Sequence, residues 1–255
     1  MLRALLSSCA CFLFLLSASA ATVLAKDAKG PESVALENFA LGKLDATVFL
    51  PKPPESDSPL FLYDKQCYDQ GMAMRNTERA RQAARDADTS ILPEYFSEAF
   101  GMPISKENMP VLYKLVQRVR RTLGEGARDY KKIYGRVRPF VQYNDGTCFP
   151  KAEESHRKTG SYPSGHSTRG WGVALLLSEI NPERAETILK RGMEYGQSRV
   201  ICGYHWQTDV DAGRLLASAL MARLHNNPEF LTHLEKAKAE YALLRDRQDG
   251  KPAKQ

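Results

Sequence analysis

The sequence lacks several features that would assign it to a large class at once. Beyond the N-terminus, none of its 255 residues belongs to an apolar run of eighteen or more, the length that a membrane-spanning helix needs. Its basic residues are interspersed with acidic ones, so the formal net charge of +6 gives no indication of nucleic-acid binding. We therefore expect neither stable membrane insertion nor a nucleic-acid partner.

Cysteine is scarce as well. Of the five cysteines, Cys9 and Cys11 lie in the N-terminal apolar segment, which leaves Cys67, Cys148 and Cys202 in the rest of the chain. Three cysteines form at most one internal disulfide, so a scaffold built on disulfides is excluded. Their spacing leaves the pairing open.

The first twenty residues have the pattern of a secretory signal peptide. Arg3 supplies a positive start, an apolar stretch reaches Leu16, and Ala18-Ser-Ala20 offers a small-residue cleavage site. The apolar stretch, at roughly 13 residues, is short for a membrane anchor. We expect cleavage after Ala20, with an alternative after Ala25, and a mature protein that is periplasmic or secreted. Cleavage lowers the formal charge to +5, because Arg3 is the only charged residue removed.

The rest of the chain divides into three parts. Residues 21–60 are polar and rich in proline, which predicts an extended arm. Residues 61–247 are dominated by helical periodicity and form the expected domain, and residues 248–255 are a polar tail. The interpretation is an all-α, single-domain helical bundle.

Four groups of apolar residues predict the helices of this bundle. They recur at three- and four-residue steps, as Leu112, Leu115, Val119 and Leu123; as Ala185, Ile188, Leu189, Met193 and Gly196; as Leu216, Leu220 and Leu224, from about Asp209; and as Phe230, Leu234, Tyr241 and Leu244. Asn181-Pro182 and Asn227-Pro228 each place a capping residue before a first-turn proline, so each is expected to end one helix and start another.

Three segments stand apart from this packing pattern because they concentrate cations, glycine and histidine. In the first, Lys131 and Arg138 bracket a predicted helix end, because Pro139 disfavours helical geometry at the residue before it. The second, residues 160–166, reads Gly-Ser-Tyr-Pro-Ser-Gly-His before an apolar helix expected over 171–180. The third, residues 198–209, contains Ser-Arg, a histidine and an aspartate.

The cations of these segments suit phosphoryl transfer, in which catalysis is mostly positioning and electrostatic stabilisation. Arg138 and Arg199 offer forks that match phosphate, and Lys131 offers a point charge. The Ser164-Gly165 turn is expected to open a helix, whose first N–H groups attract anions, and glycine lets the backbone approach closely. We assign these five residues to phosphate binding.

The two histidines supply the remaining chemistry. Asp209 lies four residues after His205, on the same face if a helix begins at His205, and would fix the histidine tautomer so that the other ring nitrogen attacks phosphorus. His166 would protonate the leaving oxygen and then activate water. A histidine pKa near 6.5, with a phosphate favouring the cation, suits an acid at acidic or near-neutral pH.

Other phosphatase mechanisms do not fit the spacing. No cysteine is followed six positions later by arginine, no Gly-x4-Gly-Lys loop occurs, and none of the five histidines stands in a recognisable zinc spacing. Asp209-Val-Asp211 resembles an aspartyl-phosphate motif, but no apolar strand precedes it. We expect no metal and no other cofactor.

The order Lys-x6-Arg-Pro, Pro-Ser-Gly-His, Ser-Arg-x5-His-x3-Asp resembles the type-2 phosphatidic-acid-phosphatase superfamily. Residues 160–166 and 197–207 are closer still to the class A bacterial non-specific acid phosphatases, with support from residues 75–79, 179–182 and 189–192. The likeness covers roughly residues 45–245. It implies the helical fold of that superfamily, which vanadium chloroperoxidases share, and periplasmic location without a metal requirement. It implies the same roles for His205, His166 and Asp209, and for the five phosphate ligands.

The resemblance further implies broad hydrolysis of phosphomonoesters with release of inorganic phosphate, and inhibition by vanadate. It also implies a homodimer or larger homo-oligomer and, in some members, phosphate transfer to nucleosides. We expect residues 167–169, which follow His166, to be positions that can alter substrate preference. Two alternatives remain: a vanadium haloperoxidase, in which His205 would ligate vanadate, and a non-catalytic periplasmic phosphate-binding protein, which would not need two positioned histidines.

Overall fold

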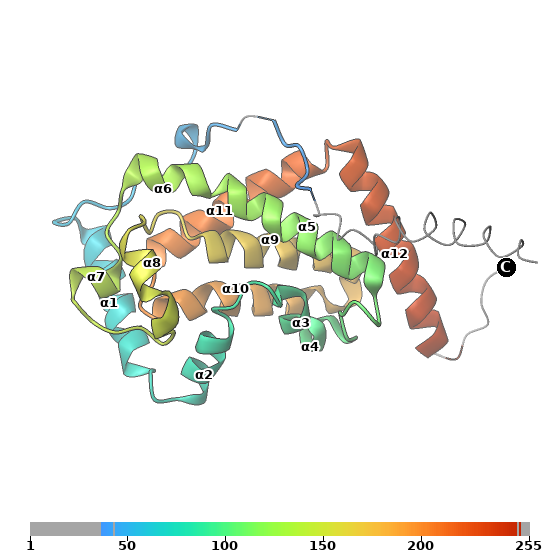
Figure 1. The fold of residues 1–255 in the computed structure, drawn as a ribbon, viewed down its shortest axis with the longest axis horizontal. Helices are drawn as coiled ribbons and strands as arrows, with labels where there is room; N and C mark the ends of the chain where they lie inside the picture. The colour runs from blue at the N-terminus through green and yellow to red at the C-terminus, as the bar shows by residue number, and fades with distance from the viewer. Residues whose placement is uncertain (1–36, 43, 249, 251–255) are drawn as a thin grey trace, which may run out of the picture. The chain divides into compact units, whose positions relative to one another are not determined.

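The computed structural model describes residues 37–42, 44–248 and 250, and these residues form helices and no strand (Figure 1). The longer helices are α1 (Pro59–Ala73), α2 (Glu78–Arg85), α5 (Pro110–Gly126), α9 (Gly165–Ile180), α10 (Ala185–Ile201), α11 (Gln207–Leu224) and α12 (Pro228–Gln248). The shorter ones are α3 (Leu92–Tyr95), α4 (Ser97–Phe100), α6 (Arg128–Tyr134), α7 (Pro139–Gln142) and α8 (Glu153–Arg157), with 3-10 turns at Ala46–Val48, Pro150–Ala152 and Pro182–Arg184. The expected all-α, single-domain fold is confirmed.

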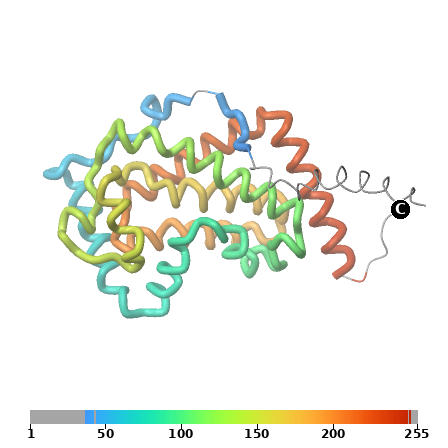
Figure 2. The backbone as a smooth tube through the Cα atoms, in the orientation of Figure 1, coloured from blue at the N-terminus to red at the C-terminus, as the bar shows by residue number. Residues whose placement is uncertain are grey.

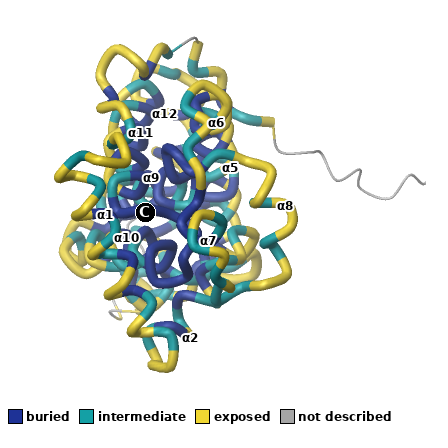
Figure 3. The backbone as a smooth tube through the Cα atoms, turned by 90° about the vertical axis from the view of Figure 1, so that its left-hand side faces the viewer, coloured by how far each residue is buried: buried dark blue, intermediate teal, exposed yellow. Residues whose placement is uncertain are grey.

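Helix α9 is the centre of the bundle, and α5, α10 and α11 pack around it (Figures 1 and 2). Most of its sequence is apolar or small, with Arg169 and Glu179 as its charged residues, and ten of its sixteen residues are buried. A helix of that composition needs neighbours on most of its sides. Val173, Leu176 and Leu177 are fully buried there. Figure 3 shows buried backbone in the middle of the bundle, with α2 and α8 at its margin. The central turns of α9 are therefore held by the neighbouring helices.

The predicted stripe of α5 is confirmed, because all four of its residues are buried. The stripe predicted for α10 is wrong in part: Met193 is 43% exposed. The buried face of α10 instead passes through Ile188, Gly192, Tyr195 and Arg199. Arg199 is the charged residue on this buried face, and it lies where α10 reaches the candidate site.

The predicted helix boundaries differ in detail from the structure. Asn227 caps α12, since its Oδ1 accepts from Phe230 N at 3.0 Å. Asn181 ends α9, but its side chain does not cap the next turn, because Nδ2 donates to Phe100 O at 2.9 Å. Helix α11 begins at Gln207, two residues before the expected start.

The signal peptide with its cleavage sites falls on residues 1–36, which lie outside the described residues, as do residues 249 and 251–255 of the predicted tail. Of the predicted arm, residues 37–42 and 44–58 contain one 3-10 turn, and Phe39, Ala46 and Leu50 are buried in the core. No helix among the described residues is long and apolar enough to cross a membrane.

Among the described residues there is one disulfide, between Cys148 and Cys202, with the two Cα atoms 4.7 Å apart. It joins the segment before α8 to the residue that ends α10. Cys67, on α1, is free.

Candidate active site

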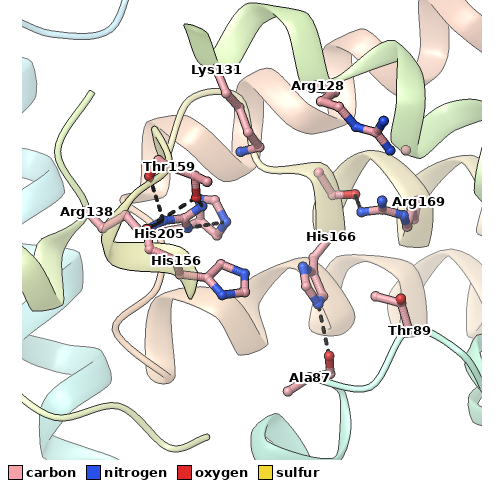
Figure 4. Close-up of a pocket in the computed structure, with 12 residues that line it drawn as sticks. Ala87, Thr89, Arg128, Lys131, Arg138, His156, Thr159, His166, Arg169 and His205 are labelled. Carbon is pink, nitrogen blue, oxygen red and sulfur yellow. Dashed lines mark hydrogen bonds between the residues drawn. The ribbon is translucent and has the colours of Figure 1, made fainter. Parts of the chain in front are cut away.

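A cavity of about 400 Å³ lies at the end of the bundle where α9 and α6 begin (Figure 4). Five of the eight predicted site residues line it: Lys131, Arg138, Gly165, His166 and His205. They come from α6, from the residue before α7, from the first turn of α9 and from the residues before α11. Three segments that are far apart in the sequence thus meet at one pocket.

His205 and Asp209 are in contact. Asp209 Oδ2 lies 3.2 Å from His205 Nδ1 and also accepts from Trp206 N at 2.9 Å, so this carboxylate caps α11 while it orients the imidazole. Arg138 Nη1 lies 3.2 Å from His205 Nε2. A guanidinium only donates, so Nε2 carries the lone pair and Nδ1 the proton in this arrangement. The expected pairing of His205 with Asp209 is present although His205 precedes the helix.

The second oxygen of Asp209 belongs to a buried network that the sequence reasoning missed. Arg136 donates through Nη1 to Asp209 Oδ1 at 2.7 Å and through Nη2 to Asp64 Oδ2 at 2.6 Å. Asp64 also accepts from the backbone N–H and the hydroxyl of Thr208. The side chains of Asp64 and Asp209 have no exposed surface. Arg136 therefore links α1 to the first turn of α11 by one ion pair to each helix.

Arg138 is extended, with φ −75° and ψ 148°, as the proline after it predicts. Besides His205 it contacts the carbonyls of His156, Thr159, Gly160 and Tyr204. These contacts fix the guanidinium beside the imidazole. A bound anion would exchange with some of these acceptors.

Lys131 occupies a different position from a simple surface cation. Its Nζ donates to three carbonyls, those of Gly160, Ser161 and Pro163, at 3.3, 3.2 and 2.8 Å. The ammonium thus holds the segment that leads into α9. It lies on the pocket wall and supplies its charge from there.

The remaining predicted residues, Ser164 and Arg199, lie behind the residues that line the pocket and are fully buried. Ser164 caps α9: its Oγ accepts from Ser167 N, and its own N–H donates to Asp209 O at 2.9 Å. Arg199 stacks on Tyr204, 4.5 Å from the ring centre. Among the described residues, its Nε and Nη1 have no hydrogen-bond acceptor. Arg199 is the predicted ligand with donors free for an anion.

His166 crosses the pocket from the first turn of α9. Its Nε2 lies 3.1 Å from Ala87 O, and its ring stacks on Tyr195 with the centres 6.3 Å apart. A carbonyl only accepts, so Nε2 carries a proton and Nδ1 remains for chemistry. The contact between His166 and Ala87 could not be predicted from a residue pattern, because its acceptor is a backbone atom.

The carbonyl that holds His166 is itself anchored by its neighbour Asp86. This buried carboxylate pairs with Arg191 through Nη1 and Nη2 and accepts from Ser198 Oγ at 2.6 Å. Arg79 donates to the same hydroxyl at 3.0 Å. The segment from Asp86 to Ala87 is therefore fixed to α10.

Burial and cationic neighbours set the protonation of the site. Burial, followed by Arg138, lowers the pKa of Lys131 to about 7. Burial, followed by the nearby cations, also lowers the pKa values of His205 and His166 well below their usual range. The expected cationic His166 is thus not favoured by the protein alone, because Arg199 and Arg169 oppose it.

A third histidine, His156 on α8, also lines the pocket, and the sequence reasoning did not assign it. Its Nδ1 lies 2.7 Å from Ala152 O. Burial lowers the pKa of His156 to about 4. Its position between the first and second segments was the only available signal.

The arrangement combines a neutral, oriented imidazole with donors for an anion and a second imidazole across the pocket. Among the described residues, no group of three histidine, cysteine or acidic side chains is placed to hold a metal ion. Nucleophilic displacement at a phosphoryl group is the reaction that this set of groups can carry.

Comparison with known proteins points to the same chemistry. Residues 122–231 match the PAP2 superfamily. The chain is 52% identical to a non-specific acid phosphatase of Providencia stuartii over 205 residues, which are 79% of this chain and 83% of that protein.

Two more distant relatives agree. A non-specific acid phosphatase of Salmonella typhimurium is 44% identical over 200 residues, covering 77% of this chain and 80% of the relative. An acid phosphatase of Zymomonas mobilis is 39% identical over 199 residues, covering 77% and 75%.

Proposed function

This chain belongs to the non-specific acid phosphatases of the PAP2 superfamily, and from that premise we propose that it cleaves phosphomonoesters through a phosphohistidine on His205. The observation that carries the proposal is the orientation of His205. Asp209 holds Nδ1, while Nε2 faces the pocket beside Arg138. A nucleophile needs this combination of a fixed ring and a directed lone pair.

The first step forms a bond between His205 Nε2 and phosphorus and breaks the bond from phosphorus to the ester oxygen. The departing oxygen takes a proton from His166 Nδ1, the ring nitrogen not bonded to Ala87. Arg138 and Arg199 bind the equatorial oxygens, and Lys131 adds charge from the wall. The first N–H groups of α9, at Gly165 and His166, have no acceptor within the helix and are placed to donate to the same group.

The second step returns the enzyme to its starting state. His166 takes a proton from water, the water oxygen bonds to phosphorus, and the bond to His205 Nε2 breaks. Inorganic phosphate leaves as the monoanion and carries away the proton that His166 took, so the imidazole is neutral again. Asp209 stabilises the positive charge that develops on His205 in both steps, and it orients the ring rather than touching the substrate.

Because burial lowers the pKa of His166, we propose that the substrate supplies the first proton. Below about pH 6, a phosphomonoester binds as a monoanion that carries one proton. Transfer of that proton to His166 leaves a dianion beside an imidazolium, and the dianion offsets the repulsion from Arg199 and Arg169. An acidic working range follows, since His205 stays neutral there.

The finer properties of the family extend the proposal. We propose a periplasmic or secreted mature protein, with a signal peptide in residues 1–20, an arm over 21–60, a catalytic domain over 61–247 and a tail over 248–255. We further propose a broad range of phosphomonoesters, transfer of phosphate to nucleosides, inhibition by vanadate and assembly as a homodimer or larger homo-oligomer. The enzyme acts without a metal or cofactor.

The test is release of phosphate from p-nitrophenyl phosphate at about pH 6. Wild type and His205→Ala are compared with excess chelator present, and Lys190→Gln on the exposed face of α10 serves as a control. Turnover should persist in chelator, survive in the control and be lost in His205→Ala. Quenching wild type in alkaline denaturant with substrate radiolabelled at phosphorus should trap label that is stable in alkali and released in acid. Activity of His205→Ala above a few per cent would contradict the role of His205.

A further inference from the structure

The pocket continues past His166 on the side away from His205. Figure 4 shows Arg138 and His205 at one end, His166 between, and Arg128, Arg169 and Thr89 at the other end. None of these three outer residues has a role in the steps above. We call Arg128 and Arg169 the outer arginine pair.

Arg169 is placed by its own helix and by a glycine opposite. Its Nη1 donates to Gly165 O, one turn back on α9, at 3.0 Å. A Cβ at Gly124 of α5 would collide with the guanidinium, so the absence of a side chain there makes room for it. The fork therefore has a defined place on the pocket wall.

The outer arginine pair has little acidic compensation. No ion pair among the described residues involves Arg128 or Arg169, nor their neighbour Arg120, which donates to Thr89 Oγ1 at 3.2 Å. Asp88, which lies near Arg120, is bonded to the N–H and hydroxyl of Ser90. Arg120 and Arg128 both lower the pKa of Arg169, after burial. Arg128 and Arg169 thus line one end of the pocket, and Arg120 adds to the positive charge around Arg169.

The geometry of the displacement indicates which part of a substrate would lie near the outer arginine pair. In an in-line displacement the leaving group departs on the side opposite the nucleophile. With His205 as nucleophile and His166 as acid, the leaving group extends past His166 toward the outer arginine pair. Arg128 is exposed to water and Arg169 is held by Gly165 O. A neutral leaving group would give neither guanidinium an anionic partner, whereas a second anion would.

We propose that the outer arginine pair binds a second anionic group, a phosphoryl or a carboxylate, on the leaving group, so that the enzyme prefers such phosphomonoesters to neutral ones of the same size. The inference rests on the proposed function, because the assignment of His205 and His166 fixes the direction of the leaving group. The proposal makes Arg169, three residues after His166, a specificity-determining residue.

Three esters on one carbon skeleton test it: glycerol 1-phosphate, 3-phosphoglycerate and glycerol 1,3-bisphosphate. We expect kcat/KM of wild type at pH 6 and fixed ionic strength to be about tenfold higher for one or both anionic esters than for glycerol 1-phosphate. The carboxylate and phosphoryl arms show which second anion is preferred. Each enzyme's rate with the neutral ester is its own reference.

Variants distinguish a specific effect of the outer arginine pair from a general effect of the protein's positive charge. Arg169→Gln and Arg128→Gln should each reduce the preference several-fold, while Lys190→Gln, which removes one exposed positive charge elsewhere, should retain it. Arg128 is exposed, so its variant tests the idea even if loss of the more buried Arg169 prevents folding. Equal kcat/KM for all three esters in wild type, or a preference that both variants keep, would overturn the inference. Failure of wild type to hydrolyse any ester would instead contradict the proposed function.

Discussion

Arg136 Nη1 lies 2.7 Å from Asp209 Oδ1, so the carboxylate that orients His205 is shared with a buried guanidinium. The same guanidinium pairs with Asp64, and both acids lack exposed surface. Asp209 is thereby held in one orientation, and its other oxygen remains for the imidazole and the cap of α11. The orientation of His205 therefore depends on a series of contacts that runs from Asp64 on α1 through Arg136 to Asp209.

Substitution of Arg136 tests whether these contacts orient His205. Arg136→Gln leaves two buried carboxylates without a cation, and we expect it to lower the free energy of unfolding by about 3–5 kcal/mol. It should also lower kcat more than it changes KM, because it acts through Asp209 rather than on the substrate. Urea denaturation and steady-state kinetics measure both effects. Lys132→Gln, an exposed charge on α6, is the control, and equal effects in the two variants would contradict the assignment.

Asp209→Asn tests the orientation itself. The amide is close in size to the carboxylate but loses the charge that stabilises the developing imidazolium. We expect kcat to fall by roughly 10²- to 10⁴-fold, with circular dichroism unchanged. An unchanged kcat would remove Asp209 from the mechanism.

Lys131 predicts a pH dependence of anion binding. Because its pKa is about 7, the ammonium form dominates at pH 6 and the neutral amine at pH 8. A lowered lysine pKa means that positive charge is lost as pH rises, so anion affinity should fall. Sulfate is a suitable probe since its own charge is constant in this range, and calorimetry should show binding roughly tenfold weaker at pH 8 than at pH 6. Lys131→Met should flatten the profile; the same slope in that variant would exclude Lys131 as the cause.

The disulfide predicts a measurable contribution to stability. Cys148 and Cys202 are 54 residues apart, and closing a loop of that length stabilises the fold by about 4 kcal/mol in the chain-entropy account. Cys148→Ser should reduce the free energy of unfolding by an amount of that order, measured in urea. Cys67→Ser, the matched change at the free cysteine, should have a small effect. A reductant that lowers the stability of Cys148→Ser as much as that of wild type would contradict the prediction.

Much of the site was predictable because its residues follow local rules. Pro139 fixes the extended geometry of Arg138, Ser164 and Gly165 open a helix, and the four-residue step joins His205 to Asp209. The fold class followed from periodicity in the same way. Local signals fail where a partner is distant in sequence or is a backbone atom.

The missed elements illustrate both failures. Asp64 meets Arg136 across 72 residues, and His166 bonds to the carbonyl of Ala87 across 79. Neither contact leaves a spacing pattern. Met193 was misplaced because the buried face of α10 passes through Gly192 and Tyr195, and periodicity alone does not show which face the neighbouring helices cover. Site residues with long-range partners therefore required the structure.

The crowding of cations around two neutral imidazoles has a thermodynamic consequence for the whole molecule. Lys131, Arg138 and Arg169 are each held below their usual pKa by burial and mutual repulsion, so the unliganded fold carries a cost that an anion relieves. Folding and ligand binding are then linked: an anion at 100 times its dissociation constant adds about 2.7 kcal/mol to the stability of the native state. Product phosphate, which competes with substrate, would at the same time act as a protective agent for the enzyme that makes it.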